Sequence, residues 1–204
     1  MSFKLLREEV IDAGLCQGCA LCAGKCKHIV MDKTRPTLKD YCILERDGLK
    51  CSKCYDSCPQ IRQTKYKDKD PIQIHSLRSK DPKILKNAAS GGVVTTLAKH
   101  VLDLKLVNHL VMVQDIDDKP KAQTIDNGKA AVDKAGVIYG RSGVLQKLNE
   151  LVGETSDPVG IIGVPCEMRG AADLETEMKR DILKIGLFCN SQMRSHLTDG
   201  GHVC

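Results

Sequence analysis

Eight of the eleven cysteines in this 204-residue chain fall within its first 58 residues, at the spacing found in iron–sulfur proteins. The first run reads C-x2-C-x2-C-x3-C and ends at Cys26, while the second reads C-x2-C-x3-C-P and ends at Cys58 and Pro59. Cys42 stands alone between them. A cubane iron–sulfur cluster takes four thiolates, and one tight loop can supply three of them. The spacing therefore constrains this part of the chain to fold around metal, and it indicates a role in electron transfer.

The fourth ligand of each cluster is expected from the other run, because paired runs of this kind exchange their last cysteine. Counting back from Cys58 puts the first ligand of the second run at position 48, where the chain has Gly48, so Cys42 is expected to take that role. The first cluster then has the ligands Cys16, Cys19, Cys22 and Cys58, and the second has Cys26, Cys42, Cys51 and Cys54. Two four-ligand [4Fe-4S] clusters use all eight cysteines.

Two other chemistries use the same residue type. Four-cysteine zinc sites also contain CxxC pairs, but these are usually separated pairs rather than a C-x2-C-x2-C triplet. Disulfides are disfavoured because the cysteine total is odd and because Lys4, Arg7 and Glu8 interrupt any apolar secretion signal. Lys27 stands where ferredoxin-type runs usually have proline, which changes no ligand. So many free thiols indicate a reducing compartment, and we expect a cytoplasmic protein.

Charge and hydropathy limit the partners. The apolar stretches, such as 159–165, are far too short to cross a bilayer, so no transmembrane segment is expected and any membrane association would be peripheral. The net charge of +5 is spread along the chain without the basic and aromatic pattern of nucleic-acid-binding proteins. We therefore expect no nucleic-acid partner.

The hydrophobic pattern divides the chain into three parts. Residues 1–62 are expected to form an α+β ferredoxin-like module with two [4Fe-4S] clusters, and 63–71 a polar linker. From 72 onward strand and helix patterns alternate, which predicts an α/β domain with a mostly parallel sheet over 72–204. The expected strands are 72–77, 109–113, 160–164 and 182–189, with a polar turn at 115–121 and helices starting at 82, 93, 144 and 167.

Two features of this second part suggest ligand binding. Ser90, Gly91 and Gly92 stand where a loop enters a helix, and free N–H groups at a helix start bind phosphate or a polar flavin edge. An ordinary helix cap explains the same residues. Cys166 and Cys189 each follow a strand, where open α/β sheets gather ligands, although a cysteine there can equally be a small buried apolar residue.

The order of these motifs resembles the coenzyme F420 hydrogenase/dehydrogenase beta-subunit family from about Cys16 to Cys189. The matching segments are the cysteine runs, residues 77–82 and 90–97, Ala135-Gly136 with Tyr139 and Ser142, residues 163–166 and residues 186–189. The resemblance implies an FAD-containing iron–sulfur oxidoreductase subunit that moves electrons between a deazaflavin-type hydride donor and clusters, with coenzyme F420 as a candidate substrate. It also implies partner redox subunits in a hydrogenase- or dehydrogenase-type complex.

The resemblance also assigns residues. Ser90, Gly91, Gly92 and Thr95 would contact FAD, and Gly136, Tyr139 and Ser142 would shape the flavin pocket. Cys166 and Cys189 would be ligands of a third cluster. Family members continue into a downstream CxxC pair, whereas this chain stops at Cys204, so we expect the C-terminal part to be short and the third cluster incomplete. Glu167 stands where the family often has glutamine.

Three functions remain open at this point. The first is the flavin-dependent oxidoreductase subunit, for which no acid–base pair stands out in the sequence, as expected if cofactors carry the chemistry. The second is a flavin-free electron carrier or docking subunit of a larger redox complex. The third is a zinc-stabilised scaffold.

Overall fold

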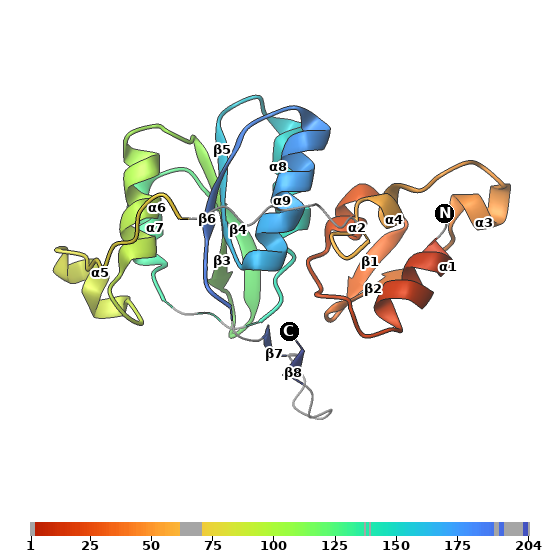
Figure 1. Ribbon diagram of the computed structural model, residues 1–204, viewed down its shortest axis with the longest axis horizontal. Helices are drawn as coiled ribbons and strands as arrows, with labels where there is room; N and C mark the ends of the chain where they lie inside the picture. The colour runs from red at the N-terminus through yellow and green to blue at the C-terminus, as the bar shows by residue number, and fades with distance from the viewer. Residues whose placement is uncertain are drawn as a thin grey trace.

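The computed structural model describes residues 3–61, 71–136, 138, 140–189 and the backbone of two short strands, β7 Gln192–Met193 and β8 His202–Val203. The N-terminal part consists of short helices around one antiparallel hairpin (Figure 1). Its elements are α1 Phe3–Leu6, the π-helical turn η1 Arg7–Ile11, α2 Leu21–Lys25, β1 Ile29–Asp32, β2 Arg35–Leu38, α3 Ile43–Asp47 and α4 Lys53–Asp56.

Little of this part is regular secondary structure, and its core is small. Phe3, Leu6, Val10 and Ile29 are buried together, and Cys54 and several partly buried cysteines of the two runs pack with them. A core of this size gives limited hydrophobic stabilisation, so metal binding is expected to supply part of the folding free energy. The resemblance to a ferredoxin module remains a prediction.

The second part is a four-stranded sheet with helices on both faces, in the strand order β4-β3-β5-β6. The strands are β3 His109–Asp115, β4 Pro120–Ile125, β5 Val159–Gly163 and β6 Ile182–Gly186. The helices are α5 Pro82–Asn87, α6 Val93–Asp103, α7 Gly128–Asp133, α8 Val144–Glu154 and α9 Pro165–Met178. Helices α6 and α7 lie on one face of the sheet, and α8 and α9 lie on the other (Figure 1).

Successive residues of the central strands point to opposite faces. Leu110 and Ile162 pack with α6, whereas Val111 and Ile161 pack with α8 and α9. All four side chains are buried, since both faces of these strands are covered. This arrangement accounts for the continuous apolar runs in the sequence.

The sheet is mixed, which corrects the expectation of a polar turn at 115–121. β3, β5 and β6 run parallel, but β4 pairs antiparallel with β3 from Leu110↔Ile125 to Asp115↔Pro120. Asp117 and Asp118 both have positive φ angles, as a two-residue type I′ hairpin requires. β4 escaped prediction because it is an edge strand that begins at proline and carries polar residues.

The strand expected at 72–77 is also wrong. Residues 72–77 form no strand, and Ile72 and Ile74 are 98% and 85% exposed. The alternating pattern predicts a strand only where a neighbouring edge is available to pair with it. The expected linker, 63–71, lies outside the described residues except for Pro71.

The two parts of the chain are joined through α2, which packs on α8. Leu21 is buried in the same core cluster as Leu145 and Leu148. The Asn149 side-chain amide donates a 3.0 Å hydrogen bond to the Gly24 carbonyl, and the backbone of Gly24 lies so close to α8 that a Cβ would be 3.3 Å from the Gln146 Cα. The predicted boundary near residue 62 is thus crossed by tight contacts.

Within the described ranges, no helix is both long enough and apolar enough to cross a membrane.

Candidate metal centres and cofactor loop

The first expected ligand set lines one pocket. It contains Cys16, Cys19, Cys22 and Cys58. Left-handed backbone at Gly18 and Ala20 (φ 65° and 61°) turns the loop so that the residues before and within α2 face the same space. The backbone N–H groups of Leu15 and Cys16 both donate to the Val10 carbonyl, which fixes the start of that loop on η1.

Apolar surroundings dominate this pocket. Leu6, Val10, Ile11, Met31 and Pro36 line it, and none of the described lining side chains carries a formal charge. Burial raises the pKa of the Cys19, Cys22 and Cys58 thiols, and the neighbouring thiols raise it further. These three thiols therefore stay protonated unless a cation joins them, because a cation offsets the burial of several thiolates.

The second expected set lines a separate pocket. It contains Cys26, Cys42, Cys51 and Cys54. Burial raises the pKa of Cys54 to about 12, and the nearby thiols Cys26, Cys42 and Cys51 add to the shift. The structure thus gathers the cysteines into the two groups of four that the exchanged-end pairing requires. None of the ten cysteines within the described residues forms a disulfide.

Neither set is arranged around a single ion. Among the described residues, no three His, Cys, Asp or Glu side chains come together in a way that could hold one metal ion. The thiols instead surround the two pockets. Four thiolates around one space are the donor set of a cubane cluster, so the chemistry of both sets fits that group.

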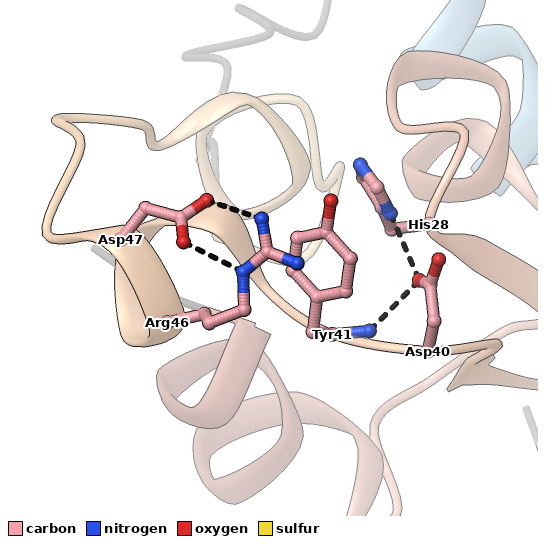
Figure 2. A network of polar contacts seen from close by, with 5 residues as sticks. All are labelled: His28, Asp40, Tyr41, Arg46 and Asp47. Atoms are coloured by element: carbon pink, nitrogen blue, oxygen red, sulfur yellow. Dashed lines mark hydrogen bonds and ion pairs between the residues drawn. The ribbon is translucent and has the colours of Figure 1, made fainter.

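A polar network joins the residues that flank Cys26 and Cys42 in the sequence (Figure 2). His28 lies two residues after Cys26, and its Nδ1 is 2.8 Å from Asp40 Oδ1, which also accepts the Tyr41 N–H. This carboxylate ties the segment after Cys26 to the segment before Cys42.

The aromatic ring of Tyr41 extends the same network. It packs on the ring of His28 at 4.6 Å, and the Arg46 guanidinium lies 3.3 Å from its centre. Arg46 in turn makes two hydrogen bonds to the Asp47 carboxylate. The sequence did not predict this network, because contacts between loops twelve residues apart leave no periodic signal.

Replacing Asp40 by alanine should lower iron binding at the second set, because Cys42 loses its tie to the Cys26 segment. We expect iron content to fall towards about four atoms per chain, the content of one cubane cluster. Asp47→Ala is the matched control, since it removes an acid of the same network that does not hold the two segments together. Equal iron in the two variants would show that Asp40 has no positioning role.

The glycine loop precedes α6, as expected, but its glycines are explained by packing. Ser90 is exposed, and Gly92 caps α6 with a φ of 69°. A Cβ on Gly91 would lie 2.9 Å from the Leu77 carbonyl, and the Gly91 carbonyl accepts the Ser79 N–H at 2.7 Å. The backbone of Gly91 therefore lies close to residues 77–79 of the same chain, and this packing accounts for the glycine without a ligand. Thr95 lies one turn into α6 and is partly exposed.

The structure does not bring the other residues expected in the flavin pocket together at one site within its described ranges. Gly136 is exposed, and Tyr139 lies outside the described residues. Ser142 directly precedes the N-cap residue of α8, Gly143, whose φ of 71° is one that glycine adopts readily. The Ser142 hydroxyl is buried without a hydrogen-bond partner, which makes it a polar group suited to a ligand.

Cys166 belongs with the first cysteine set. It lies in the first turn of α9 and lines the same pocket as Cys16, Cys19, Cys22 and Cys58. Burial raises its pKa to about 11, with smaller contributions from Glu167 and Cys189. Cys189 is exposed. The expected third-cluster pair is thus near enough for its members to interact electrostatically, but Cys166 faces the first pocket.

Comparison with known proteins identifies the middle of the chain. Residues 74–149 match the sequence model of the family described as coenzyme F420 hydrogenase/dehydrogenase, beta subunit N-term. This segment is similar to that family. The family segment runs from the residues before α5 to the middle of α8, so it includes the glycine loop and Ser142 but neither cysteine set.

Individual relatives are similar to this chain over longer stretches than the family model, and two of them are named for coenzyme F420. A coenzyme F420-dependent sulfite reductase of Methanocaldococcus jannaschii is 26% identical over 207 residues, covering 91% of this chain and 32% of the relative. An uncharacterised protein of the same organism is 27% identical over 92% of this chain and 62% of its own length. A coenzyme F420 hydrogenase subunit beta of Methanosarcina barkeri is 29% identical over 124 residues, which are 56% of this chain and 43% of the relative. The chain thus spans under two thirds of these relatives.

The fold is similar to one chain of the F420-reducing [NiFe] hydrogenase complex of Methanosarcina barkeri. The TM-score is 0.54 at 23% identity, over 58% of this chain and 44% of that chain. At this identity the likeness concerns the fold alone.

Glu167, in the first turn of α9, should make stability depend on pH. Its carboxylate accepts the Val164 N–H at 2.9 Å, and burial raises its pKa from 4.5 to about 6. Because the folded state favours the protonated form, the free energy of unfolding falls as pH rises from about 4.5 to about 6 and then stays low. The shift corresponds to about 2 kcal/mol.

Glu167→Gln keeps the acceptor and removes the buried charge. The variant should therefore be more stable than the parent by about 2 kcal/mol above pH 6, and the difference should shrink towards zero near pH 4.5. Urea unfolding across this pH range measures it. Glu154→Gln, at an exposed position, is the control and should show a flat difference. If the difference in unfolding free energy between the parent and Glu167→Gln did not change with pH, burial of the Glu167 charge would not be the cause.

Proposed function

We propose that this chain is the iron–sulfur and flavin-binding portion of an oxidoreductase subunit that moves electrons between a deazaflavin-type hydride donor and iron–sulfur clusters. The observation that carries the proposal is the division of eight cysteines between two pockets, four in each. The relatives named for coenzyme F420 support a donor of that class.

In this proposal the residues have separate tasks. Cys16, Cys19, Cys22 and Cys58 would hold one [4Fe-4S] cluster, and Cys26, Cys42, Cys51 and Cys54 a second. Ser90 and Thr95 at the start of α6 would bind FAD, with the buried Ser142 hydroxyl as a further donor. Bound FAD would supply the conversion between a hydride and single electrons, and bound clusters one-electron transfer.

In this proposal the apolar lining of the first pocket would exclude water from the thiolates there. The proposed setting is a cytoplasmic redox complex with other hydrogenase- or dehydrogenase-type subunits. The proposed domain limits remain 1–62 and 72–204, with a linker at 63–71.

A second candidate is a flavin-free electron carrier. It is favoured by the packing explanation for Gly91 and Gly92, whose lack of side chains the fold itself requires. The two candidates differ in flavin content and share the clusters.

Iron, sulfide and flavin analysis of protein purified without oxygen tests both. About eight irons and eight sulfides with one flavin per chain would support the oxidoreductase subunit. About eight irons without flavin would favour the carrier. Zinc without sulfide would overturn both, and it would identify a zinc-stabilised scaffold.

A further inference from the structure

The two cysteine pockets differ in what surrounds them. The first is lined by apolar residues and reaches the second part of the chain through Cys166. Every residue that lines the second pocket lies between Phe3 and Cys54, and this pocket meets the sheet domain through the ion pair of Lys25 with Glu177 of α9. The first set is therefore the inner site, next to the sheet domain, and the second set is the outer site.

Positive charge collects at the outer site. Lys25, Lys27, Lys53 and His28 line the second pocket, together with its four cysteines. The Lys25 side chain is only 12% exposed and pairs with Glu177 at 2.9 Å, and His28 pairs with Asp40. Lys27 and Lys53 are exposed, and neither forms an ion pair with any residue that the structure describes.

Unpaired lysines beside an electron-transfer site have a physical consequence. The electrostatic field of these lysines concentrates anions at the opening of the second pocket. It therefore raises the rate at which a negatively charged partner reaches that opening. Exposed charges act on encounter rates more than on affinity, and lysine keeps its flexibility, so the contact would be brief. Brief contact suits a protein that must release its electron partner after each transfer.

We propose that the mouth of the second cysteine pocket, with Lys27 and Lys53, is the docking face for an acidic one-electron carrier protein. The proposal rests on the proposed function, since it needs a cluster in that pocket. One electron would pass between the outer site and the carrier, so one is oxidised as the other is reduced, and no bond or proton is exchanged. An electron would then pass from the sheet domain to the inner site, from there to the outer site, and finally to the acidic partner.

Small charged oxidants of opposite sign probe this face directly. The protein, purified without oxygen and reduced with dithionite, is mixed in a stopped-flow instrument with hexacyanoferrate(III) or with hexaammineruthenium(III). The variant Lys27→Glu/Lys53→Glu is compared with Lys83→Glu/Lys129→Glu. Helices α5 and α7 lie at the opposite end of the molecule from α2 and α4 (Figure 1). Lys83 in α5 and Lys129 in α7 are exposed, and the control changes net charge equally.

The pocket variant should lose about tenfold in the rate with the anionic oxidant and gain with the cationic one, whereas the control pair should change little. Added salt should reduce the difference between the oxidants. Equal rates in the two variants, or a parent that reacts faster with the cation, would overturn the docking face. Lys27→Gln/Lys53→Gln should shift the rates in the same direction by a smaller factor. This neutral variant replaces the charge-reversal variant in the test if charge reversal impairs folding.

Iron analysis of each sample separates this inference from the proposed function. A parent without iron and sulfide would overturn the clusters themselves. A parent with about eight irons whose rates ignore Lys27 and Lys53 would leave the clusters intact and exclude only the docking face.

Discussion

Replacing Cys54 by serine is expected to remove about half of the protein's iron, from about eight atoms per chain to about four. Cys54 lies in the second pocket and is 6% exposed, in a small apolar core against which other cysteines pack. Loss of one ligand in four weakens the cluster, and it also removes the folding free energy that metal binding supplies. We therefore expect a lower urea midpoint as well as a lower iron content.

Cys189→Ser is the control, because Cys189 is exposed and belongs to neither set. It should retain about eight irons. Unchanged iron in Cys54→Ser would mean that the ligand sets are wrong. Loss of iron in Cys189→Ser would mean that a third cluster forms, contrary to the expectation from the sequence.

Leu145→Ala should cost about 2–5 kcal/mol of stability, the usual range for removing a buried leucine side chain. Leu145 is fully buried in α8, between the sheet and α9. The backbone of Gly170 in α9 comes so close that a Cβ there would collide with Leu145 Cδ1 and lie 3.2 Å from Pro59 Cγ. The same leucine therefore stabilises the sheet domain and its contact with the N-terminal part.

A double-mutant cycle tests this packing. Gly170→Ala alone should be destabilising by about 1–3 kcal/mol, because it overfills the contact. In the Leu145→Ala background the added methyl group enters the vacated space, so its cost should disappear or become a gain. Urea unfolding of the four proteins measures the coupling, and simple additivity would show that the two residues do not share the space.

The sequence was a good guide wherever a pattern has a local cause. The cysteine spacing, with exchange of the last cysteine between the two runs, predicted the two groups of four thiols that line the pockets, although it did not place Cys166 in the first. Helices α6, α8 and α9 were predicted from apolar spacing, and α5 from its aspartate cap and first-turn proline. These signals depend on residues within one or two turns of each other.

Other features depend on distant partners, and the sequence alone could not supply them. β4 is a strand because β3 offers an edge, and Ile72 and Ile74 are not in a strand because nothing described pairs with them. Cys166 faces the first cysteine set because α9 and the N-terminal part are packed together. The ligand roles of all these cysteines stay predictions until metal is measured.

The burial of Leu21 against α8 has an evolutionary consequence. Ferredoxin modules are often regarded as exchangeable units that recombination can attach to new partners. Here residues 18–25 form part of the core and hydrogen bonding of the neighbouring domain, through Leu21 and through Gly24 and Lys25. A transplanted module would expose apolar surface on α8 unless it brought an equivalent leucine and glycine. A substitution at this contact in one part therefore limits the side chains that the other part can carry there.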